Sequence, residues 1–412
     1  MAKEVLNNSK VPIKKIVKTV QRVPNKTVAT KQAVSYLYGC FRIMGIHIPK
    51  KNPHLYIVYS IIINCLTTLF TPISFTSSYF IKSNAAVSFD IKLSSMQAAI
   101  DVYGCAIKIL VLIYYKHKLE AAEKLMDKMD KRCQAEDEVQ ELYNIRNLGR
   151  RIVVGYCAAY WTYTTMTLIS AFVSGAPSYS INLFIIDWRH SKIEFYLASF
   201  IEYLLTSWTC FQQVANDSYG TVYVCILRAQ VRILLLRIRK MGSRLEQSAE
   251  ENFEELKSVI QDHKDLIELH NAISPVISRT IFLQFSITAA MLSITLINIA
   301  IFSTHIAATA ASSIYVVVVL VEIFPLCYYA QCLVYDSDTL ATEIFHSSWI
   351  LKDKRYRKML VFFMQRTQKS MELWAGKIIP VNLSSFISIA KFSFSLYTLI
   401  KQMGIKERLG LH

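Results

Sequence analysis

The longest uncharged stretch of the chain, residues 280–321, limits what this protein can fold into more than any other feature. Its 42 residues contain no Asp, Glu, Lys or Arg. As one helix they would extend roughly 63 Å, about twice the hydrocarbon thickness of a bilayer. The stretch therefore predicts two membrane-crossing helices joined by a tight hairpin between Ser303 and His305.

The rest of the chain has the composition of a membrane protein with several spans. Apolar residues make up 53% of the 412 residues, charged residues only 18%, and the mean hydropathy is +0.31. These values are too apolar for a typical soluble domain. We predict an all-α fold, a single domain over residues 1–412 with seven transmembrane helices. The predicted spans are 55–81, 93–115, 152–175, 194–227, 280–302, 308–331 and 383–403.

Polar segments between the spans carry apolar residues at helical spacing. One such stripe follows the second span, at Leu119, Ala122, Met126 and Met129. Another follows the fourth span, at Phe253, Leu256, Ile260 and Ile267. This spacing predicts amphipathic helices that extend the spans into water. Each extension has too little apolar surface to fold alone, so we expect them to form one cytoplasmic domain.

Lys and Arg alternate between the segments that flank the spans. In chain order the counts are eleven, two, nine, two, nine, none, eight and three. The positive-inside rule then predicts a cytoplasmic N-terminus and an extracellular C-terminus. The net charge of +16 is concentrated beside the spans, which favours membrane lipid over nucleic acid as the partner. Phosphate-binding loops, HExxH and GxSxG are absent from the sequence, so we expect neither an enzyme nor a cofactor or metal.

Charged residues within the predicted spans are candidates for function. Asp101 and Lys108 share a helix face but are two turns apart, and we expect Lys108 to reach the cytoplasmic boundary. Asp217, near a helix end, is expected to reach water. Glu322 and Lys391 allow two interpretations, an ion pair between the sixth and seventh spans or two solvated positions.

Residues 322–400 carry a specific motif. It comprises Glu322-Ile-Phe, Cys327-Tyr-Tyr, Ser337, Leu340, Ala341, Phe345, Ser347 and Trp349, then Ala375-Gly-Lys, Pro380, Asn382-Leu, Phe386, Lys391-Phe and Ser395-Leu-Tyr-Thr-Leu-Ile. This pattern resembles the C-terminal signature of insect odorant receptors, of the odour-tuning type rather than the shared co-receptor. Within it, Gly376 and Pro380 predict a turn, and Asn382, Ser384 and Ser385 are candidate caps for the last helix.

The resemblance implies a function. Insect odorant receptors form non-selective, ligand-gated cation channels, heterotetramers with a co-receptor in the plasma membrane of olfactory neuron dendrites, anchored through the cytoplasmic extensions. Two alternatives are a G-protein-coupled-type chemoreceptor and a gustatory-receptor-like channel. The first would place the eleven-cation N-terminus outside and should show an acid-Arg-Tyr triplet and Asn-Pro-x-x-Tyr, which the sequence lacks.

A volatile ligand needs an apolar cavity with aromatic walls and a few polar groups. In this family the binding pocket lies in the outer half of the helix bundle. Aromatic, hydroxyl and small side chains from four predicted spans meet this need. The candidate ligand-binding residues are Met96, Tyr103, Tyr160, Trp161, Thr164, Phe195, Ala198, Glu202 and Tyr315.

The family's pore narrows at the outer end of the seventh span. Alignment of its terminal Gln with Gln402 puts the constriction on Leu399 and Met403. These two residues are four apart and share a helix face. We predict that Leu399, Gln402 and Met403 form the gate.

Overall fold

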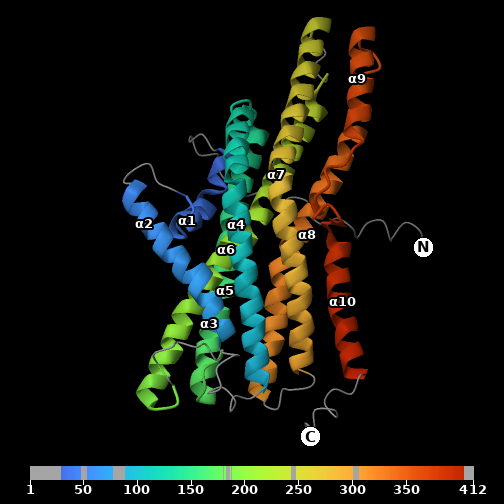
Figure 1. The fold of residues 1–412 in the computed structure, drawn as a ribbon. Helices are drawn as coiled ribbons and strands as arrows, with labels where there is room; N and C mark the ends of the chain where they lie inside the picture. The colour runs from blue at the N-terminus through green and yellow to red at the C-terminus, as the bar shows by residue number, and fades with distance from the viewer. Residues whose placement is uncertain are drawn as a thin grey trace, which may run out of the picture.

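The computed structural model describes residues 29–47, 53–77, 89–179, 181, 186, 188–242, 247–299 and 306–402. Long helices dominate it (Figure 1). The helices are η2 (Thr30–Gln32), α1 (Ser35–Ile43), α2 (Pro53–Asn64), the π-helical η3 (Cys65–Phe70), α3 (Thr71–Ser77), α4 (Phe89–Asp130), α5 (Glu136–Ser174), α6 (Lys192–Lys240), α7 (Ala249–Ile297), α8 (Ile306–His346), α9 (Lys354–Thr367) and α10 (Leu383–Gln402). A short antiparallel hairpin, β1 (Trp374–Ala375) and β2 (Ile379–Pro380), precedes α10.

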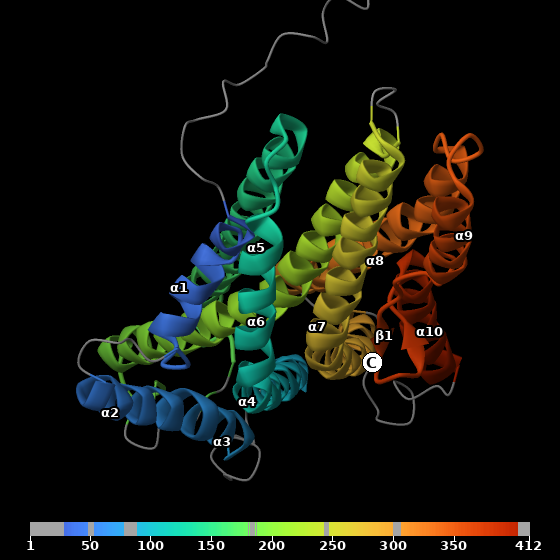
Figure 2. The ribbon, with the colours of Figure 1, turned by 90° about the horizontal axis from the view of Figure 1, so that it is seen from above.

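Helix α6 lies at the centre of the subunit. It packs against α5 and α8 along most of its length, and also against α4 and α7 (Figure 2). Every residue from 212 to 227 is buried, including several polar ones. A helix that is buried on all sides must satisfy its polar groups within the protein. Two of these polar residues, Gln213 and Asp217, belong to the charged cluster described below.

Four segments are long and apolar enough to cross a membrane: Pro53–Ser77, Ser95–Asp130, Ala249–Ile297 and Ser312–His346. Leu383–Leu399 is a shorter apolar helix. Helices also cover the predicted third and fourth spans, but Thr and Tyr in α5 and buried polar residues in α6 reduce their hydropathy. The all-α fold class is confirmed, whereas the exact span limits remain a prediction. The predicted hairpin between Ser303 and His305 lies outside the described residues.

The extensions of α4, α6, α7 and α8 project from the same end of the bundle (Figure 1). The first predicted stripe, Leu119, Ala122, Met126 and Met129, is buried in the main core there. A capping box begins α7, where Ser248 and Glu251 bond each other's backbone N–H. These features support the predicted helical extensions.

The hairpin fixes where α10 begins. Gly376 has a φ of +59°, and its N–H donates to Ser278 O on α7 at 2.9 Å. A Cβ on Gly376 would lie 2.7 Å from the Phe282 ring, so the turn requires glycine both for its backbone and for this close approach. Of the candidate caps, Asn382 accepts the N–H of Ser385 at 2.8 Å. The predicted turn and helix start are therefore both present.

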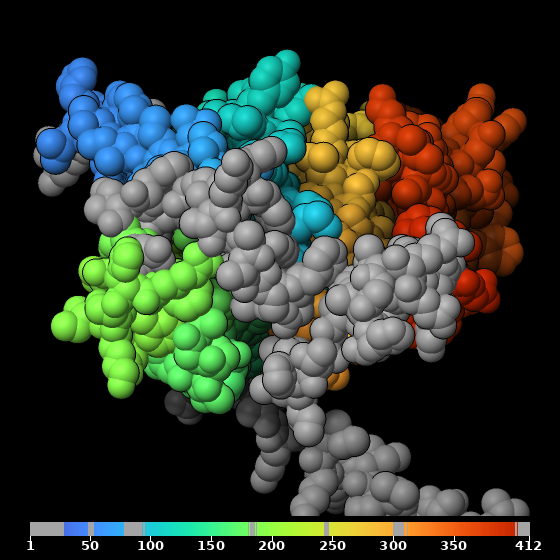
Figure 3. Space-filling model, turned by 60° about the horizontal axis from the view of Figure 1, so that its bottom comes forward, coloured from blue at the N-terminus to red at the C-terminus, as the bar shows by residue number. Residues whose placement is uncertain are grey.

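At the opposite end of the subunit, the ends of α5 and α6 are far from α10. Seen from that end, the ends of α5 and α6 and the helix α10 lie on opposite sides of the molecule (Figure 3). Any effect of a ligand near α5 and α6 on α10 must therefore cross α7 or α8.

Candidate functional site

Three tyrosines meet between α5, α8 and the segment that follows α5. The hydroxyls of Tyr163 and Tyr179 are hydrogen-bonded, and the ring of Tyr163 lies 5.7 Å from that of Tyr315. Phe75 on α3 packs edge-on against Tyr179 at 5.9 Å. We call Tyr163, Tyr179 and Tyr315 the outer tyrosine cluster. It gives an apolar aromatic wall with hydroxyl groups, which is the chemistry a small volatile ligand requires.

Some buried polar groups near this cluster have hydrogen-bond partners, and others have none in the described structure. Glu202 on α6 is buried, and its Oε1 accepts the backbone N–H of Tyr179 at 2.8 Å. Ser199, one turn earlier on α6, and Ser74, next to Phe75, are buried, and their hydroxyls have no partner within the described part of the chain. Buried hydroxyls without a partner indicate a place for a water or a ligand. Both are donors for an acceptor atom of a bound molecule.

The candidate ligand residues fall into two groups. Tyr160, Thr164, Ala198 and Glu202 are buried, and Phe195 and Tyr315 are half-buried. By contrast, Trp161 is 67% exposed, and Met96 and Tyr103 are also on the surface of the subunit. Tyr103 still contacts the site region, because its hydroxyl is 3.0 Å from Thr76 Oγ1 on α3. The structure thus does not bring Met96 and Trp161 to the outer tyrosine cluster.

Two members of the cluster were missed by the sequence prediction. Tyr163 is three residues after Tyr160 and shares its face of α5, so helical spacing could have identified it. Tyr179 lies beyond the end of α5 at Gly175, where no periodicity applies. Only the folded chain returns it to α5 and α6.

A buried charged cluster lies deeper in the bundle. Lys108 on α4 is 1% exposed, and its Nζ donates to Asp217 Oδ1 and to Gln213 Oε1 on α6, each at 3.0 Å. It also donates to Gln284 Oε1 on α7. All three ammonium protons therefore have acceptors. The expectation that Lys108 reaches the cytoplasmic boundary is wrong, because this cluster satisfies it inside the protein.

The two glutamines that accept from Lys108 also donate hydrogen bonds to further carboxylates. Gln213 donates to Asp101 Oδ1 at 2.8 Å, and Gln284 donates to Glu322 on α8. Tyr160 donates to Asp217 Oδ2 at 2.8 Å. Asp217 is buried, so the expectation that it reaches water is also wrong. We call Asp101, Lys108, Tyr160, Gln213, Asp217, Gln284 and Glu322 the Lys108 cluster.

The Lys108 cluster joins five helices, α4 to α8. Tyr160 is part of it and lies one helical turn from Tyr163 in the outer tyrosine cluster. At its other side, Phe324, two residues after Glu322, packs against Phe386 on α10 at 5.7 Å. Helix α5 thus connects the Lys108 cluster to the tyrosines, and helix α8 connects it to α10. The alternative pairing of Glu322 with Lys391 is not found in the described structure, where Lys391 is exposed and Glu322 binds Gln284.

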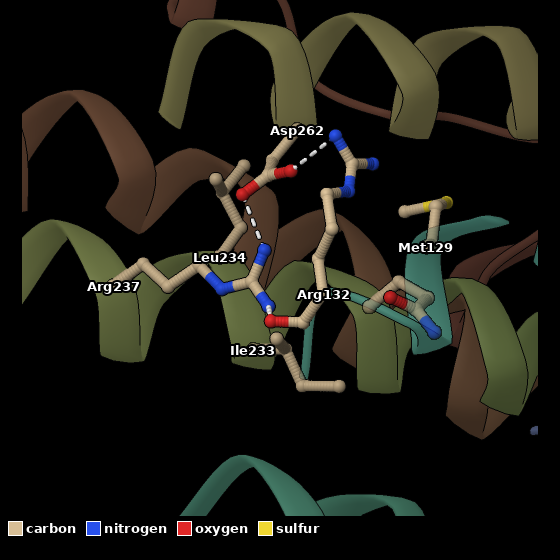
Figure 4. Close-up of a pocket in the computed structure, with 7 residues that line it drawn as sticks. Met129, Arg132, Ile233, Leu234, Arg237 and Asp262 are labelled. Atoms are coloured by element: carbon tan, nitrogen blue, oxygen red, sulfur yellow. Dashed lines mark hydrogen bonds and ion pairs between the residues drawn. The ribbon is translucent and has the colours of Figure 1, made fainter. Parts of the chain in front are cut away.

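A small pocket lies in the extensions, lined by residues such as Met129, Leu234 and Asp262 (Figure 4). Arg132 NH1 is 2.8 Å from Asp262 Oδ1, and Arg237 also pairs with Asp262. Burial lowers the pKa of Arg237, but its hydrogen bond to Glu138 and the charge of Asp262 outweigh burial and raise it above the ordinary value. Arg237 therefore stays charged. These pairs join the turn after α4 to α6 and α7, which gives the pocket a structural role.

The face of α10 that is turned away from α7 and α8 follows a regular spacing. Ser388, Phe392, Ser395, Leu399 and Gln402 are all exposed and are separated by four, three, four and three residues. This spacing forms one stripe along the helix, within a wider exposed face that also includes Ser384, Ile387, Lys391 and Phe394. Leu399 itself is 54% exposed. Met403 lies outside the described residues.

Comparison with known proteins gives a consistent result. Residues 88–394 match the family described as 7tm odorant receptor. The chain is 35% identical over 384 residues to odorant receptor 42a of Drosophila melanogaster, covering 93% of this chain and 94% of that one. It is 32% identical over 377 residues to odorant receptor 42b of the same species, covering 90% and 94%.

The fold also matches solved structures. The olfactory receptor OR5 of Machilis hrabei in complex with eugenol aligns with a TM-score of 0.73 at 13% identity, covering 91% of this chain and 98% of that one. A second structure of the same receptor aligns with a TM-score of 0.74 at 13% identity, covering 90% of this chain and 98% of that one. At this identity the match establishes the fold alone.

Proposed function

Because the chain belongs to the odorant receptor family, we propose that it binds a volatile odorant inside its helix bundle and gates a non-selective cation channel together with a co-receptor. The observation that carries the ligand site is the outer tyrosine cluster with the unpartnered hydroxyls of Ser74 and Ser199 beside it. Aromatic rings supply apolar contact, and the hydroxyls are free to donate. These groups suit a small molecule with a carbonyl or ester oxygen.

The cluster gives a sharper test of the ligand site than the exposed candidates. We expect Tyr163→Phe, which removes one hydroxyl, and Tyr315→Ala, which removes one ring, each to raise the half-maximal odorant concentration by about tenfold, since a lost hydrogen bond or aromatic contact costs about 1–1.5 kcal/mol. Trp161→Ala on the same helix is the control, because Trp161 is 67% exposed. Dose–response currents and surface labelling would measure both. A shift for Trp161→Ala as large as for the other two would place the ligand elsewhere.

The stripe on α10 supports a role for this helix in the pore. Within one subunit, α10 packs against α7 and α8 and leaves the stripe uncovered. In a tetramer with the co-receptor, we propose that the stripe faces the central axis and that Leu399, Gln402 and Met403 narrow the outer end. An apolar constriction blocks ions by excluding water.

A polar side chain at this constriction should let water enter. We expect Leu399→Ser to raise the ligand-independent current several-fold, and Leu399→Lys to suppress the cation current. Phe394→Ser is the matched control, because Phe394 is similarly exposed at 57% but lies about 140° around the helix from Leu399. Resting currents at equal surface expression would measure the difference. Equal resting currents in Leu399→Ser and Phe394→Ser would remove the stripe from the pore.

The Lys108 cluster provides a physical route between the two sites. Its contacts link α5, which carries Tyr163, to α8, which packs on α10. We propose that ligand binding shifts α5 and that the cluster passes the shift to α8. The cytoplasmic N-terminus and the location in the plasma membrane of olfactory neuron dendrites belong to the same proposal. Currents recorded from cells carrying the chain with and without a co-receptor, against a panel of volatiles, would test it.

A further inference from the structure

Two cations converge on one aromatic ring where α4 and α7 leave the apolar part of the bundle. Tyr115 on α4 is buried, and Lys118 Nζ lies 5.6 Å from its ring centroid. The guanidinium carbon of Arg279 on α7 lies 4.7 Å from the same centroid. Cation–π contacts of this kind hold both charged groups in place. The ring therefore fixes two positive charges between two neighbouring helices.

Neither charge is compensated by an acid within the described structure, where the ion pairs include no partner for Lys118 or Arg279. Lys116, two residues before Lys118, differs, because Glu120 lies 3.8 Å from it. Two fixed cations without a carboxylate create a local site for an anion. An ammonium and a guanidinium held at one ring suit a phosphate group in particular.

Apolar side chains lie directly beside these cations. On α4, Leu110 and Tyr114 are 65% and 71% exposed, and they precede Lys118 at spacings of four residues on the same face. On α7, exposed Phe282 follows Arg279 by three residues. The two helices run in opposite directions, yet on both the apolar residue lies towards the bundle and the cation towards the extensions. Both helices thus mark the same boundary between hydrocarbon and water.

We propose that Lys118 and Arg279 bind the phosphate of an anionic phospholipid whose acyl chains lie over Leu110, Tyr114 and Phe282. The cations hold the headgroup, and the exposed apolar residues distinguish a lipid from a free phosphate. Basic pockets between helices at this depth are suited to anionic headgroups. This site is separate from the outer tyrosine cluster and does not depend on the proposed channel function.

The test measures lipid binding directly. Full-length receptor in detergent would be titrated with dioctanoyl phosphatidylserine and analysed by native mass spectrometry, with dioctanoyl phosphatidylcholine and glycerophosphoserine in parallel. We expect the double variant Lys118→Gln/Arg279→Gln to bind phosphatidylserine about 25-fold more weakly, on the basis of about fivefold for each cation. Phosphatidylcholine and glycerophosphoserine should bind the parent at least about tenfold more weakly than phosphatidylserine.

The chain contains a matched control. Phe253 also holds a lysine and an arginine over its ring, Lys257 at 4.7 Å and Arg355 at 3.8 Å, but these cations pair with Glu254 and Glu250. The variant Lys257→Gln/Arg355→Gln removes the same charge and should leave lipid binding unchanged. Equal losses in the two double variants, or no loss in either, would overturn the site. Equal binding of glycerophosphoserine and phosphatidylserine would instead assign it to free phosphates and overturn the lipid.

Discussion

Replacement of Lys108 by leucine should destabilise the receptor by about 3–5 kcal/mol, the cost of removing one partner from a buried ion pair. Lys108 is 1% exposed and neutralises Asp217 at 3.0 Å. Without the ammonium, Asp217 keeps only the hydroxyl of Tyr160 as a donor in the cluster, and the Oε1 atoms of Gln213 and Gln284 each lose the donor that Lys108 provides. The thermal unfolding midpoint of the detergent-solubilised receptor would measure the loss.

Two further variants make this expectation specific. Lys108→Leu/Asp217→Asn should be less destabilised than Lys108→Leu alone, since the unpaired buried charge is gone. Lys391→Leu removes a cation that is exposed on α10, and its unfolding midpoint should stay close to that of the parent. If Lys108→Leu unfolds at the parent's temperature, the cluster does not hold the five helices together.

Replacement of Gly149 by alanine should also destabilise the receptor, by about 1–3 kcal/mol, as expected for overpacking a core. A Cβ on Gly149 in α5 would lie 2.6 Å from the backbone oxygen of Ala33, which is fully buried beside α1. A backbone oxygen cannot rotate away as the end of a flexible side chain can, so the segment before α1 must move to relieve this contact. A decrease in the unfolding midpoint relative to the parent would show it.

Gly155 on the same helix is the natural control. A Cβ there would meet nothing within 4 Å. Gly155→Ala should therefore leave the unfolding midpoint unchanged or raise it, because alanine favours a helix by up to about 1 kcal/mol over glycine. The two substitutions are chemically identical, so opposite signs isolate the contact with Ala33. A rise in the unfolding midpoint for both variants would mean that helix propensity, not packing, decides the effect. A similar decrease for both would mean that the contact with Ala33 is not the cause.

Features encoded locally were predictable from the sequence. Residues 280–321 have no charge, and their length predicted two membrane-crossing helices, because one helix of 42 residues would be about twice as long as the hydrocarbon core is thick. The stripe at Leu119, Ala122, Met126 and Met129 predicted a helix face that is buried in the structure. The C-terminal motif predicted the family, which the comparisons confirm. Each of these signals lies within a few helical turns of sequence.

The candidate ligand site was only partly predictable. Thr164 and Glu202 were predicted as polar groups in apolar spans, and both are buried, but their contact with a ligand stays a prediction. Trp161 was chosen as an aromatic in the right span, but the helix turns it outward to 67% exposure. Which face of a span is buried depends on the helices that pack against it. The hydrophobic periodicity of a helix that is apolar on all sides is weak, so the sequence does not show which face this is.

By itself, the sequence determined the all-helical class, the amphipathic extensions and the family, while the limits of its apolar spans stay a prediction. Only the tertiary structure decided how the buried charges are satisfied. Lys108 donates hydrogen bonds to Asp217, 109 residues later, and to Gln284, 176 residues later. Sequence spacing indicated only Asp101 as a nearby carboxylate, two turns away on the same helix. Helical periodicity acts over a few residues, but a buried ammonium takes its acceptors from whichever helices pack around it. Because α4 packs against α6 and α7, the charged Lys108 of the predicted second span lies in a cluster that joins five helices.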